Sequence, residues 1–470
     1  MAGISPARRV AFQILLIIER GHAHADDLLR GDAVSALSLR DRHLSTALVL
    51  GVLRWQTPLD HRLRSLLARP KARLDPEVLI ALRLGAFQLL HLDRIPARAA
   101  VDESVELVRQ AGHRFASGMV NAVLRKLAQV AKEEDTESGF VSGHAFSRAA
   151  NEPKVTRALA PEASCVPAIT AHPEWITKRW GLFFGSDATC AICQYDQTQP
   201  PLTLRLTTPL VEAELTQAGI ALEPGELLSA ARIVTSGDVT ATAAFDDRRV
   251  RIQDEGSQLV AEIAGHGSTI LDCCAAPGGK TLILAERNPE ARIVACEASA
   301  QRLEFLRQRL APFGGRIECR LADATALGFE SEFDLVLADV PCSGTGTLSR
   351  NPEIRHRLSL EDLPRQAERQ RAILARALRA ARPGGRVIYS TCSLEPEENE
   401  QVIAAVLREA EGVRVASILA RLDEMQTDQI LTASGADRLR SCITPEGFLR
   451  LFPGACSTDG FFVAIIEKSP

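Results

Sequence analysis

Leu271-Asp-Cys-Cys-Ala-Ala-Pro-Gly-Gly-Lys-Thr281 is the stretch that decides the fold of this 470-residue chain. An apolar run, 269–271, leads into an aspartate, a tight turn follows at 277–279, and a helix-compatible segment begins at 280. A strand, a glycine turn and a helix start in this order form the place where an open α/β sheet binds a nucleotide-like ligand. The alternative is an ordinary strand-to-helix loop with no ligand, because glycine turns are common.

The sequence on both sides of this stretch continues the same pattern from residue 268 onward. Apolar strand candidates alternate with helical segments, which predicts a parallel sheet with helices on both faces, a Rossmann-like α/β domain. The expected strands are 269–274, 292–297, 315–321, 333–339 and 385–391, and the expected helices are 280–288, 299–311, 361–382 and 397–410. Segments 448–452 and 460–467 are expected to close the sheet as a hairpin.

The residues around the turn restrict the class of ligand that the site can bind. A dinucleotide fold needs G-x-G-x-x-G and a P-loop needs G-x-x-x-x-G-K-[ST], and the turn matches neither. Glu297 ends the second strand 19 residues after Gly278, the spacing of a carboxylate that holds ribose hydroxyls. Asp323 follows the third strand and Asp339 ends the fourth. Together these acids favour S-adenosyl-L-methionine; the alternative for each is a helix N-cap or a solvated strand end.

Two cysteines follow the fourth and fifth strands. Cys342 lies in a Pro-Cys-Ser-Gly turn after 333–339, and Cys392 lies in Thr-Cys-Ser after 385–391. Because adjacent parallel strands end at one edge of the sheet, both thiols are expected beside the methyl donor. A lone cysteine is usually buried and inert, but packing does not easily explain two at this edge.

A thiol at this place suits methylation of a pyrimidine at C5. That carbon is a poor nucleophile until a thiolate adds to C6. An acid must stabilise the charge at N3 during the addition, and the C5 proton must leave before the thiolate is eliminated. A free thiol has a pKa of about 8.5, so the nucleophile needs local activation. Spacing alone leaves open which cysteine attacks.

The N-terminal section of the chain differs from the remainder in its charge and in its periodicity. Residues 1–130 contain 19 Lys+Arg and 12 Asp+Glu, whereas the remainder contains 36 and 47. A basic section on an acidic body suggests an anionic partner, although a solvated helical surface explains the charge equally well. Apolar residues recur at helical spacing, which predicts an all-α domain with helices at 8–20, 38–55, 59–67, 76–92, 97–111 and 118–128.

Cations gather in the middle of this helical section. The adjacent Arg54-Trp55 would suit RNA, but a buried tryptophan beside a surface arginine is at least as plausible. The others are Arg40, Arg42, Arg62, Arg64, Arg69, Lys71 and Arg73.

Two further parts complete the chain. Residues 131–170 are polar with scattered prolines and are interpreted as a linker or long insertion. Residues 171–250 are expected to form a small α+β unit resembling an RNA-recognition fold, with a helix from 173 to 180, a strand at 201–206, a helix at 211–218 and a strand at 232–234. Residues 251–470 then form the α/β domain.

Composition restricts the class of protein. No apolar run is long enough to cross a bilayer, and a signal peptide is rejected because the run near residue 11 lacks a cleavage site. Eleven cysteines without repeated spacing suit a reducing compartment. The isolated pair Cys190 and Cys193 lacks further ligands at zinc spacing, so no metal is expected. We expect a cytoplasmic monomer that does not bind membranes.

These residues resemble the RNA cytosine-5 methyltransferase family over nearly the whole chain. The motifs that carry the resemblance are Asp272–Thr281, Asp339–Gly346, Ser390–Ser393 with Glu397-Glu398-Asn399, Gln253–Gln258 and Thr458–Phe462. The helical front, through segments 8–11, 38–42 and 118–125, resembles the NusB-type RNA-binding domain. This combination is similar to the RsmB/Sun (Fmu) type, which methylates a cytosine of 16S ribosomal RNA.

The resemblance implies a role for each motif residue. Cys392 would be the nucleophile, Cys342 would assist product release, and Asp339 would contact the cytosine close to the donor. The donor, S-adenosyl-L-methionine, would be held by Cys274, Ala275, Ala276, Pro277, Gly278, Gly279, Lys280, Glu297, Asp323 and Asp339, with Arg302 a weaker candidate. The chain departs from the family pattern at Glu297, Val340, Thr207 and Gly454. None of these removes a catalytic group, so they affect specificity rather than activity.

Three alternatives remain beside 16S RNA methylation. The substrate could be transfer RNA, since the motifs do not name the target nucleotide. The basic helical domain alone would suffice for a non-catalytic ribosome-assembly factor, although loss of a thiol would favour that class and both thiols are present. A nicotinamide-dependent oxidoreductase is disfavoured by the glycine pattern.

Overall fold

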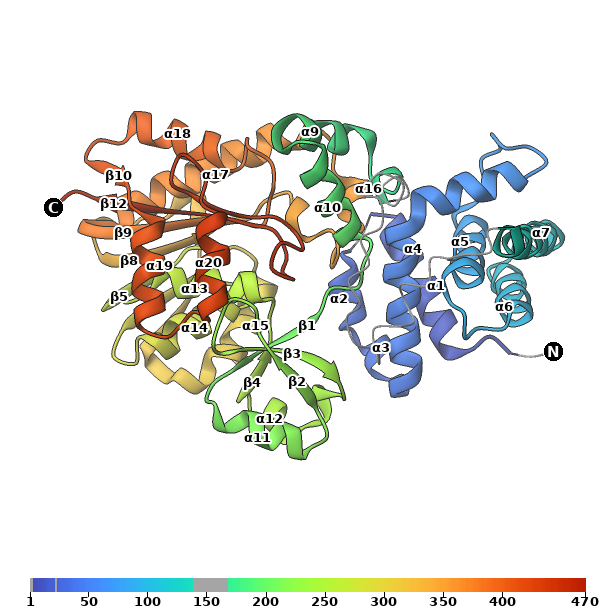
Figure 1. Ribbon diagram of the computed structural model, residues 1–470, viewed down its shortest axis with the longest axis horizontal. Coiled ribbons are helices and arrows are strands. Elements are labelled where there is room, and N and C mark those ends of the chain that lie inside the picture. The colour runs from blue at the N-terminus through green and yellow to red at the C-terminus, as the bar shows by residue number, and fades with distance from the viewer. Residues whose placement is uncertain (1–2, 22, 138–167) are drawn as a thin grey trace. The chain divides into compact units, whose positions relative to one another are not determined.

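The computed structural model describes residues 3–21, 23–137 and 168–470 (Figure 1). The chain forms two compact units, one made of 1–199 with 348–357 and the other of 200–347 with 358–470. Most of the expected linker, 138–167, lies outside the described residues. Within the described part, no helix has both the length and the apolar character needed to span a membrane.

The first unit is helical, as its periodicity predicts. Apolar residues from its five longest helices pack into one core. Its helices are α1 (Pro6–Glu19), α2 (Ala25–Leu29), α3 (Asp32–Ser35), α4 (Leu39–Leu66), α5 (Pro76–His91), α6 (Ala97–Gln110), α7 (Ser117–Glu137), α9 (Glu174–Phe184), α10 (Ser186–Asp196) and α16 (Ile354–Arg357).

The expected break between helices 38–55 and 59–67 is wrong, because α4 continues through Pro58 as one helix. Val52, Leu59 and Leu63 are all buried and continue one apolar stripe across the proline. Burial of two leucine side chains contributes about 3–6 kcal/mol. An interior proline costs about 3 kcal/mol, so packing outweighs the lost hydrogen bond.

Both sequence interpretations of Arg54 are also wrong. The Arg54 side chain is buried, and its Nε and Nη2 donate to the Ser349 carbonyl at 3.1 and 2.6 Å. Burial, with the nearby charge of Arg355, lowers the pKa of Arg54 to about 10. Trp55 is half-buried and stacks on His91, with ring centroids 4.7 Å apart. Arg54 therefore anchors the segment 348–357 and does not face solvent.

The helices α9 and α10 join this first unit, although 171–250 was expected to form one small domain. Trp180 is fully buried, and His172 lies 3.1 Å from Asp196 through Nε2 and Oδ2. Arg355 reaches the Asp196 carbonyl at 3.4 Å. The contact of His172 with Asp196 lies within the α9–α10 segment. Arg355 connects this segment to 348–357, which Arg54 also contacts, so α9 and α10 belong to the helical unit.

The second unit begins with a small four-stranded antiparallel sheet of order β2-β3-β1-β4. The expected strands 201–206 and 232–234 and the helix 211–218 are present; β2 and β4 were not anticipated. The elements are β1 (Leu202–Leu206), α11 (Leu210–Gln217), β2 (Ala221–Pro224), β3 (Ala231–Ser236), α12 (Ala243–Asp246) and β4 (Val250–Ile252).

The larger sheet of this unit confirms the α/β prediction. Its order is β10-β12-β9-β8-β5-β6-β7, with β11 paired to β12. The five expected strands pair in parallel and the C-terminal strands are antiparallel. The strands are β5 (Thr269–Asp272), β6 (Arg292–Glu297), β7 (Ile317–Leu321), β8 (Phe333–Asp339), β9 (Ala381–Thr391), β10 (Val413–Val415), β11 (Leu449–Leu451) and β12 (Phe461–Lys468).

Helices cover both faces of this sheet, because successive strand residues point to opposite sides. Leu335 and Leu337 belong to the core under one set of helices, and Val336 and Ala338 belong to the core under the other. The first face carries α13 (Glu255–Ala264), α14 (Gly279–Arg287), α15 (Ala300–Leu310), α19 (Ile418–Thr427) and α20 (Ala433–Ser441). The second carries α17 (Asp362–Ala380) and α18 (Glu400–Glu409).

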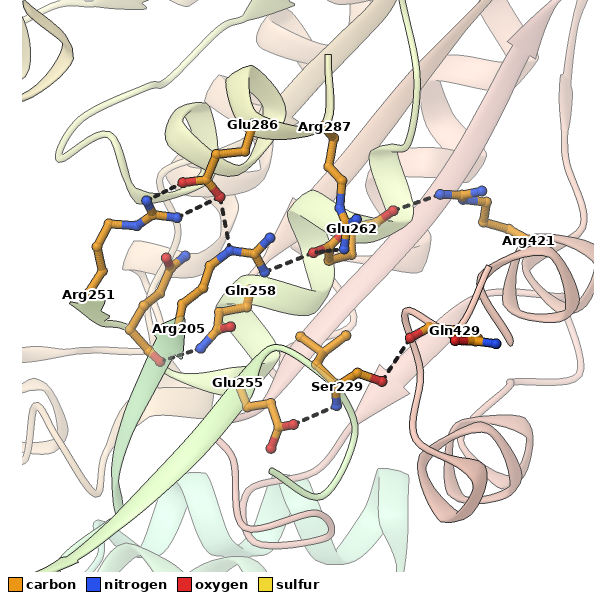
Figure 2. A network of polar contacts seen from close by, with 12 residues as sticks. Arg205, Ser229, Arg251, Glu255, Gln258, Glu262, Glu286, Arg287, Arg421 and Gln429 are labelled. Carbon is orange, nitrogen blue, oxygen red and sulfur yellow. Dashed lines mark hydrogen bonds and ion pairs between the residues drawn. The ribbon is translucent and has the colours of Figure 1, made fainter. Parts of the chain in front are cut away.

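A buried network of charges joins the small sheet to the larger domain (Figure 2). Arg205 of β1 contacts Glu262 of α13 at 2.8 Å and Glu286 of α14 at 3.2 Å. Arg251 of β4 forms two bonds to Glu286, and Arg287 forms two to Glu262. These pairs make the two sheets parts of one unit.

We expect Glu262→Ala to lower the free energy of unfolding of this unit by about 3 kcal/mol, because it removes a buried carboxylate from two ion pairs. Arg205 would keep only Glu286, and Arg287 would lose the carboxylate that accepts its two bonds. Glu262 is 1% exposed. Glu304→Ala is the matched control, since Glu304 is exposed and lies 3.8 Å from Arg307. It should change stability by less than about 1 kcal/mol. Denaturant titration of both variants tests the difference, and equal losses would contradict a specific role of the network.

Candidate active site

The turn after β5 has the shape that its glycines predict. Gly278 has φ of 96°, in the left-handed region that favours glycine, and a Cβ there would lie 2.9 Å from Leu306 Cδ1. A Cβ on Gly279 would come within 3.2 Å of the Gln253 side chain. The Gln253 Oε1 is buried and has no hydrogen-bond partner in the part of the chain that the structure describes. An unpaired acceptor beside a glycine turn fits a ligand that donates hydrogen bonds there.

The acids after β6 and β7 occupy the strand ends where they were expected. Glu297 is buried, and its Oε1 accepts from the Ser299 backbone amide at 2.8 Å. Asp323 is exposed and caps the short helix 324–326, accepting from the Thr325 amide and hydroxyl at 2.9 and 2.8 Å. The capping alternative therefore holds for Asp323, whereas Glu297 binds the amide of Ser299, the residue that caps α15.

Arg302 links the turn to the acid after β6. Its Nη2 donates to the Ala276 carbonyl at 2.8 Å, and its Nη1 lies 3.5 Å from Glu297 Oε2. The Arg302 side chain therefore braces these two parts of the predicted donor site. Asp272, at the end of β5, is fully buried and accepts from the Thr281 hydroxyl at 2.7 Å. Burial raises the pKa of Asp272 to about 6.

The structure brings the two expected thiols together. In the parallel pairing of β8 with β9, Asp339 lies opposite Ser390, so the loops after both strands leave the sheet side by side. The Sγ atoms of Cys342 and Cys392 are 3.2 Å apart. The hydrogen bond to Cys392, together with burial, raises the pKa of Cys342 well above its ordinary value. This raised pKa favours the protonated form of Cys342.

An ion pair next to the thiols was not anticipated. Lys280 Nζ lies 2.7 Å from Asp339 Oδ2, and the other carboxylate oxygen accepts from the Ser390 hydroxyl at 2.7 Å. Burial works against the lysine charge, but the Asp339 carboxylate outweighs it and raises the pKa of Lys280, with a smaller contribution from Cys392. The Lys280 side chain thus reaches from the donor turn toward Asp339 and the thiols.

Glu398 is a second residue whose place sequence reasoning did not find. It is fully buried between the loops that carry the two cysteines. The signal was present in the motif Glu397-Glu398-Asn399, but spacing could not show which of two adjacent glutamates faces inward. Among the described residues no group of three or more His, Cys, Asp or Glu side chains could hold a metal.

Comparison with known protein families matches both halves of the chain. Residues 263–467 match the family described as 16S rRNA methyltransferase RsmB/F, and residues 5–129 match the NusB family. The probable ribosomal RNA small subunit methyltransferase B of Bacillus subtilis is 31% identical and covers 98% of both chains. The ribosomal RNA small subunit methyltransferase B of Xanthomonas campestris is 31% identical over all of this chain and 98% of its own.

A solved structure supports the fold over the full length. The crystal structure of PH0851 superposes with a TM-score of 0.75 and covers 99% of this chain and all of its own, at 22% identity. The helical N-terminal section, the parallel sheet and the full-length relatives all indicate the same family. The chain belongs to the family described as 16S rRNA methyltransferase RsmB/F.

Proposed function

We propose that this protein transfers a methyl group from S-adenosyl-L-methionine to C5 of a cytosine in 16S ribosomal RNA, through a covalent bond between Cys392 and C6. The observation that carries the proposal is the pair of thiols 3.2 Å apart at the ends of β8 and β9. They lie beside the Lys280–Asp339 ion pair at the ligand edge of the sheet. Family membership supports an RNA methyltransferase, and the thiols support the C5 position.

The donor site is proposed at the edge formed by β5, β6 and β7. The main chain of 274–280, with Glu297, Asp323 and Asp339, would hold the cofactor, and the unpaired Gln253 Oε1 fits a hydrogen-bond donor beside Gly279. When bound, S-adenosylmethionine supplies an electrophilic methyl group on a positively charged sulfur. The residues of this edge orient that group toward the thiols.

Cys392 is the proposed nucleophile. The thiolate is the form of a cysteine that attacks. The Thr-Cys motif that contains Cys392 supports this assignment, and the Cys392 Sγ lies 3.2 Å from that of Cys342. Lys280 provides a positive charge on its side of the pair. Addition of the Cys392 sulfur to C6 pushes electron density to C5, which then acts as the nucleophile.

Asp339 and Cys342 are proposed to act on the charge at N3 and on the removal of the C5 proton. Asp339 contacts the pyrimidine edge and holds Lys280, whose positive charge stabilises the negative charge that develops at N3. After methylation the C5 proton must leave so that the Cys392–C6 bond can break. Cys342, adjacent to Cys392, assists that elimination and the release of product.

The helical domain is the proposed RNA-binding part, acting on 16S RNA or a small-subunit assembly intermediate. Exposed cations gather at the end of α4 and in the turn after it: Arg62, Arg64, Arg69, Lys71 and Arg73. Such a cluster suits phosphate contacts, which dominate the affinity of proteins for nucleic acids. We propose that the protein acts as a monomer in the cytoplasm.

Bisulfite sequencing of ribosomal and transfer RNA, from cells with and without this protein, tests the substrate. We expect one cytosine of 16S RNA to lose its protection when the protein is removed. Loss of protection in a transfer RNA instead would support the tRNA alternative. No change in either RNA would favour the non-catalytic assembly factor, and calorimetric titration with S-adenosylmethionine and with NAD would then test whether a donor binds at all.

A further inference from the structure

One buried carboxylate, that of Glu398, receives hydrogen bonds from both cysteine loops. Its Oε1 accepts from the Ser343 amide and from Gln370 Nε2, each at 2.9 Å. Its Oε2 accepts from the Ser393 hydroxyl at 2.5 Å and from the Ser343 hydroxyl. Every one of these groups donates, which matches an ionised carboxylate, since that form only accepts.

The donors are the immediate neighbours of the catalytic thiols. Ser343 follows Cys342 and Ser393 follows Cys392, and their hydroxyl oxygens are 3.0 Å apart. Gln370, from α17, also donates to the Pro341 carbonyl at 3.0 Å, on the other side of Cys342. The two loops come from segments 50 residues apart. The Glu398 carboxylate connects them directly, because it accepts hydrogen bonds from both.

The backbone of Glu398 is held as firmly as its side chain. The Tyr389 hydroxyl, on β9 beneath the site, donates to the Glu398 carbonyl at 2.6 Å. Asn399, the next residue, donates from Nδ2 to the Ser393 carbonyl at 2.9 Å. Because both the backbone and the carboxylate of Glu398 are held by hydrogen bonds, this residue can fix the distance between the two loops.

Glu398 also contributes to the electrostatics of the pair. The pKa of Cys342 is raised by its hydrogen bond to Cys392, by burial, and by the negative charges of Cys392 and Glu398. Another titratable group near Cys342 is Tyr389, whose own pKa is raised by burial and by its neighbours Cys342 and Glu398. On the far side, Cys392 faces Lys280.

We propose that Glu398 is a positioning residue for methyl transfer, whose carboxylate holds the Cys342 and Cys392 loops at one separation and places a negative charge beside Cys342. Glu398 acts through the two serines and does not itself touch the substrate. The importance of this role for catalysis rests on the proposed function, but the spacing and the charge can be measured without RNA.

The charge is tested with Glu398→Gln. Alkylation of Cys342 by iodoacetamide, followed by mass spectrometry of its peptide across pH, reports how readily that thiol ionises. Removal of the negative charge should move the midpoint of Cys342 alkylation to lower pH. Glu400→Gln is the matched control, because Glu400 lies two residues away and pairs with Arg450; its midpoint should stay at the wild-type position.

The spacing is tested with the double variant Ser343→Ala/Ser393→Ala, which keeps the charge and removes both hydroxyl donors. Diamide takes two electrons and two protons from neighbouring thiols and leaves a disulfide, so its rate of linking Cys342 to Cys392 reports their separation. We expect diamide to link the two cysteines more slowly. We also expect kcat to fall by about 100-fold, because a displacement near 1 Å can cost that much. The KM for S-adenosylmethionine should be unchanged.

These outcomes separate positioning from simple loss of structure. An unshifted alkylation midpoint in Glu398→Gln, or unchanged linking and kcat in the serine variant, would overturn the proposal. If circular dichroism shows that Glu398→Gln does not fold, the serine variant alone decides it. Should the enzyme methylate another atom, the alkylation and linking results still stand, so failure of the proposed function is distinguishable from failure of this inference.

Discussion

Cys392→Ala is expected to lose methyl transfer by more than about 10⁴-fold, because removal of a covalent nucleophile typically costs at least that much. The remaining thiol, Cys342, lies on the other loop and is proposed to assist product release, so we do not expect it to replace the nucleophile. Single-turnover transfer of labelled methyl groups to 16S RNA measures the loss. Binding of S-adenosylmethionine should persist, because the donor turn lies on a different strand.

The control for Cys392 is Cys319→Ala. Cys319 is a free, partly buried thiol on β7, outside the catalytic loops. It should keep activity near the wild-type level, which shows that loss of a thiol in this domain is not harmful by itself. Full activity in Cys392→Ala would refute the nucleophile assignment.

Cys342→Ala is expected to accumulate protein covalently joined to RNA. Without the second thiol the Cys392–C6 bond still forms, but proton removal from C5 and release of Cys392 are slowed. The adduct should appear as a slowly migrating band on a denaturing gel, and it should require S-adenosylmethionine for full yield. The double variant Cys342→Ala/Cys392→Ala should show no band.

The same gel decides between the two possible role assignments. If Cys392→Ala traps RNA while Cys342→Ala does not, then Cys342 is the nucleophile. Spacing in the sequence could not make this distinction, and the contact between the two sulfurs is symmetric. The negative charge of Glu398 on the Cys342 side disfavours the thiolate of Cys342.

The parallel sheet could be predicted because its signals are local. Continuous apolar runs, each ending in a polar residue, identify buried strands, and the intervening segments have helical period. Strand β8 was expected at 333–339 and lies there. The short strand β10 was missed because three residues carry no usable period, and its pairing with β12 depends on the end of the chain.

The errors in the helical unit have the same origin. Pro58 is a strong local signal for a helix end, yet α4 continues because its leucines are buried on one side. Arg54 looks like a surface cation, yet it is buried against the Ser349 carbonyl. In both cases a long-range contact, which no window of sequence contains, outweighs the local preference.

By itself the sequence determined which chemical groups stand at the ends of the strands: the acid of β8 and the two thiols that follow β8 and β9. This is possible because parallel strands must end at one edge, whatever the details of packing. Only the tertiary structure decided how those groups pair. The 3.2 Å between the sulfurs, the ion pair of Lys280 with Asp339 and the place of Glu398 between the loops depend on the register of β8 with its neighbours β9 and β5. That register is set by the packing of the whole sheet against its helices, so it cannot be read from any single motif.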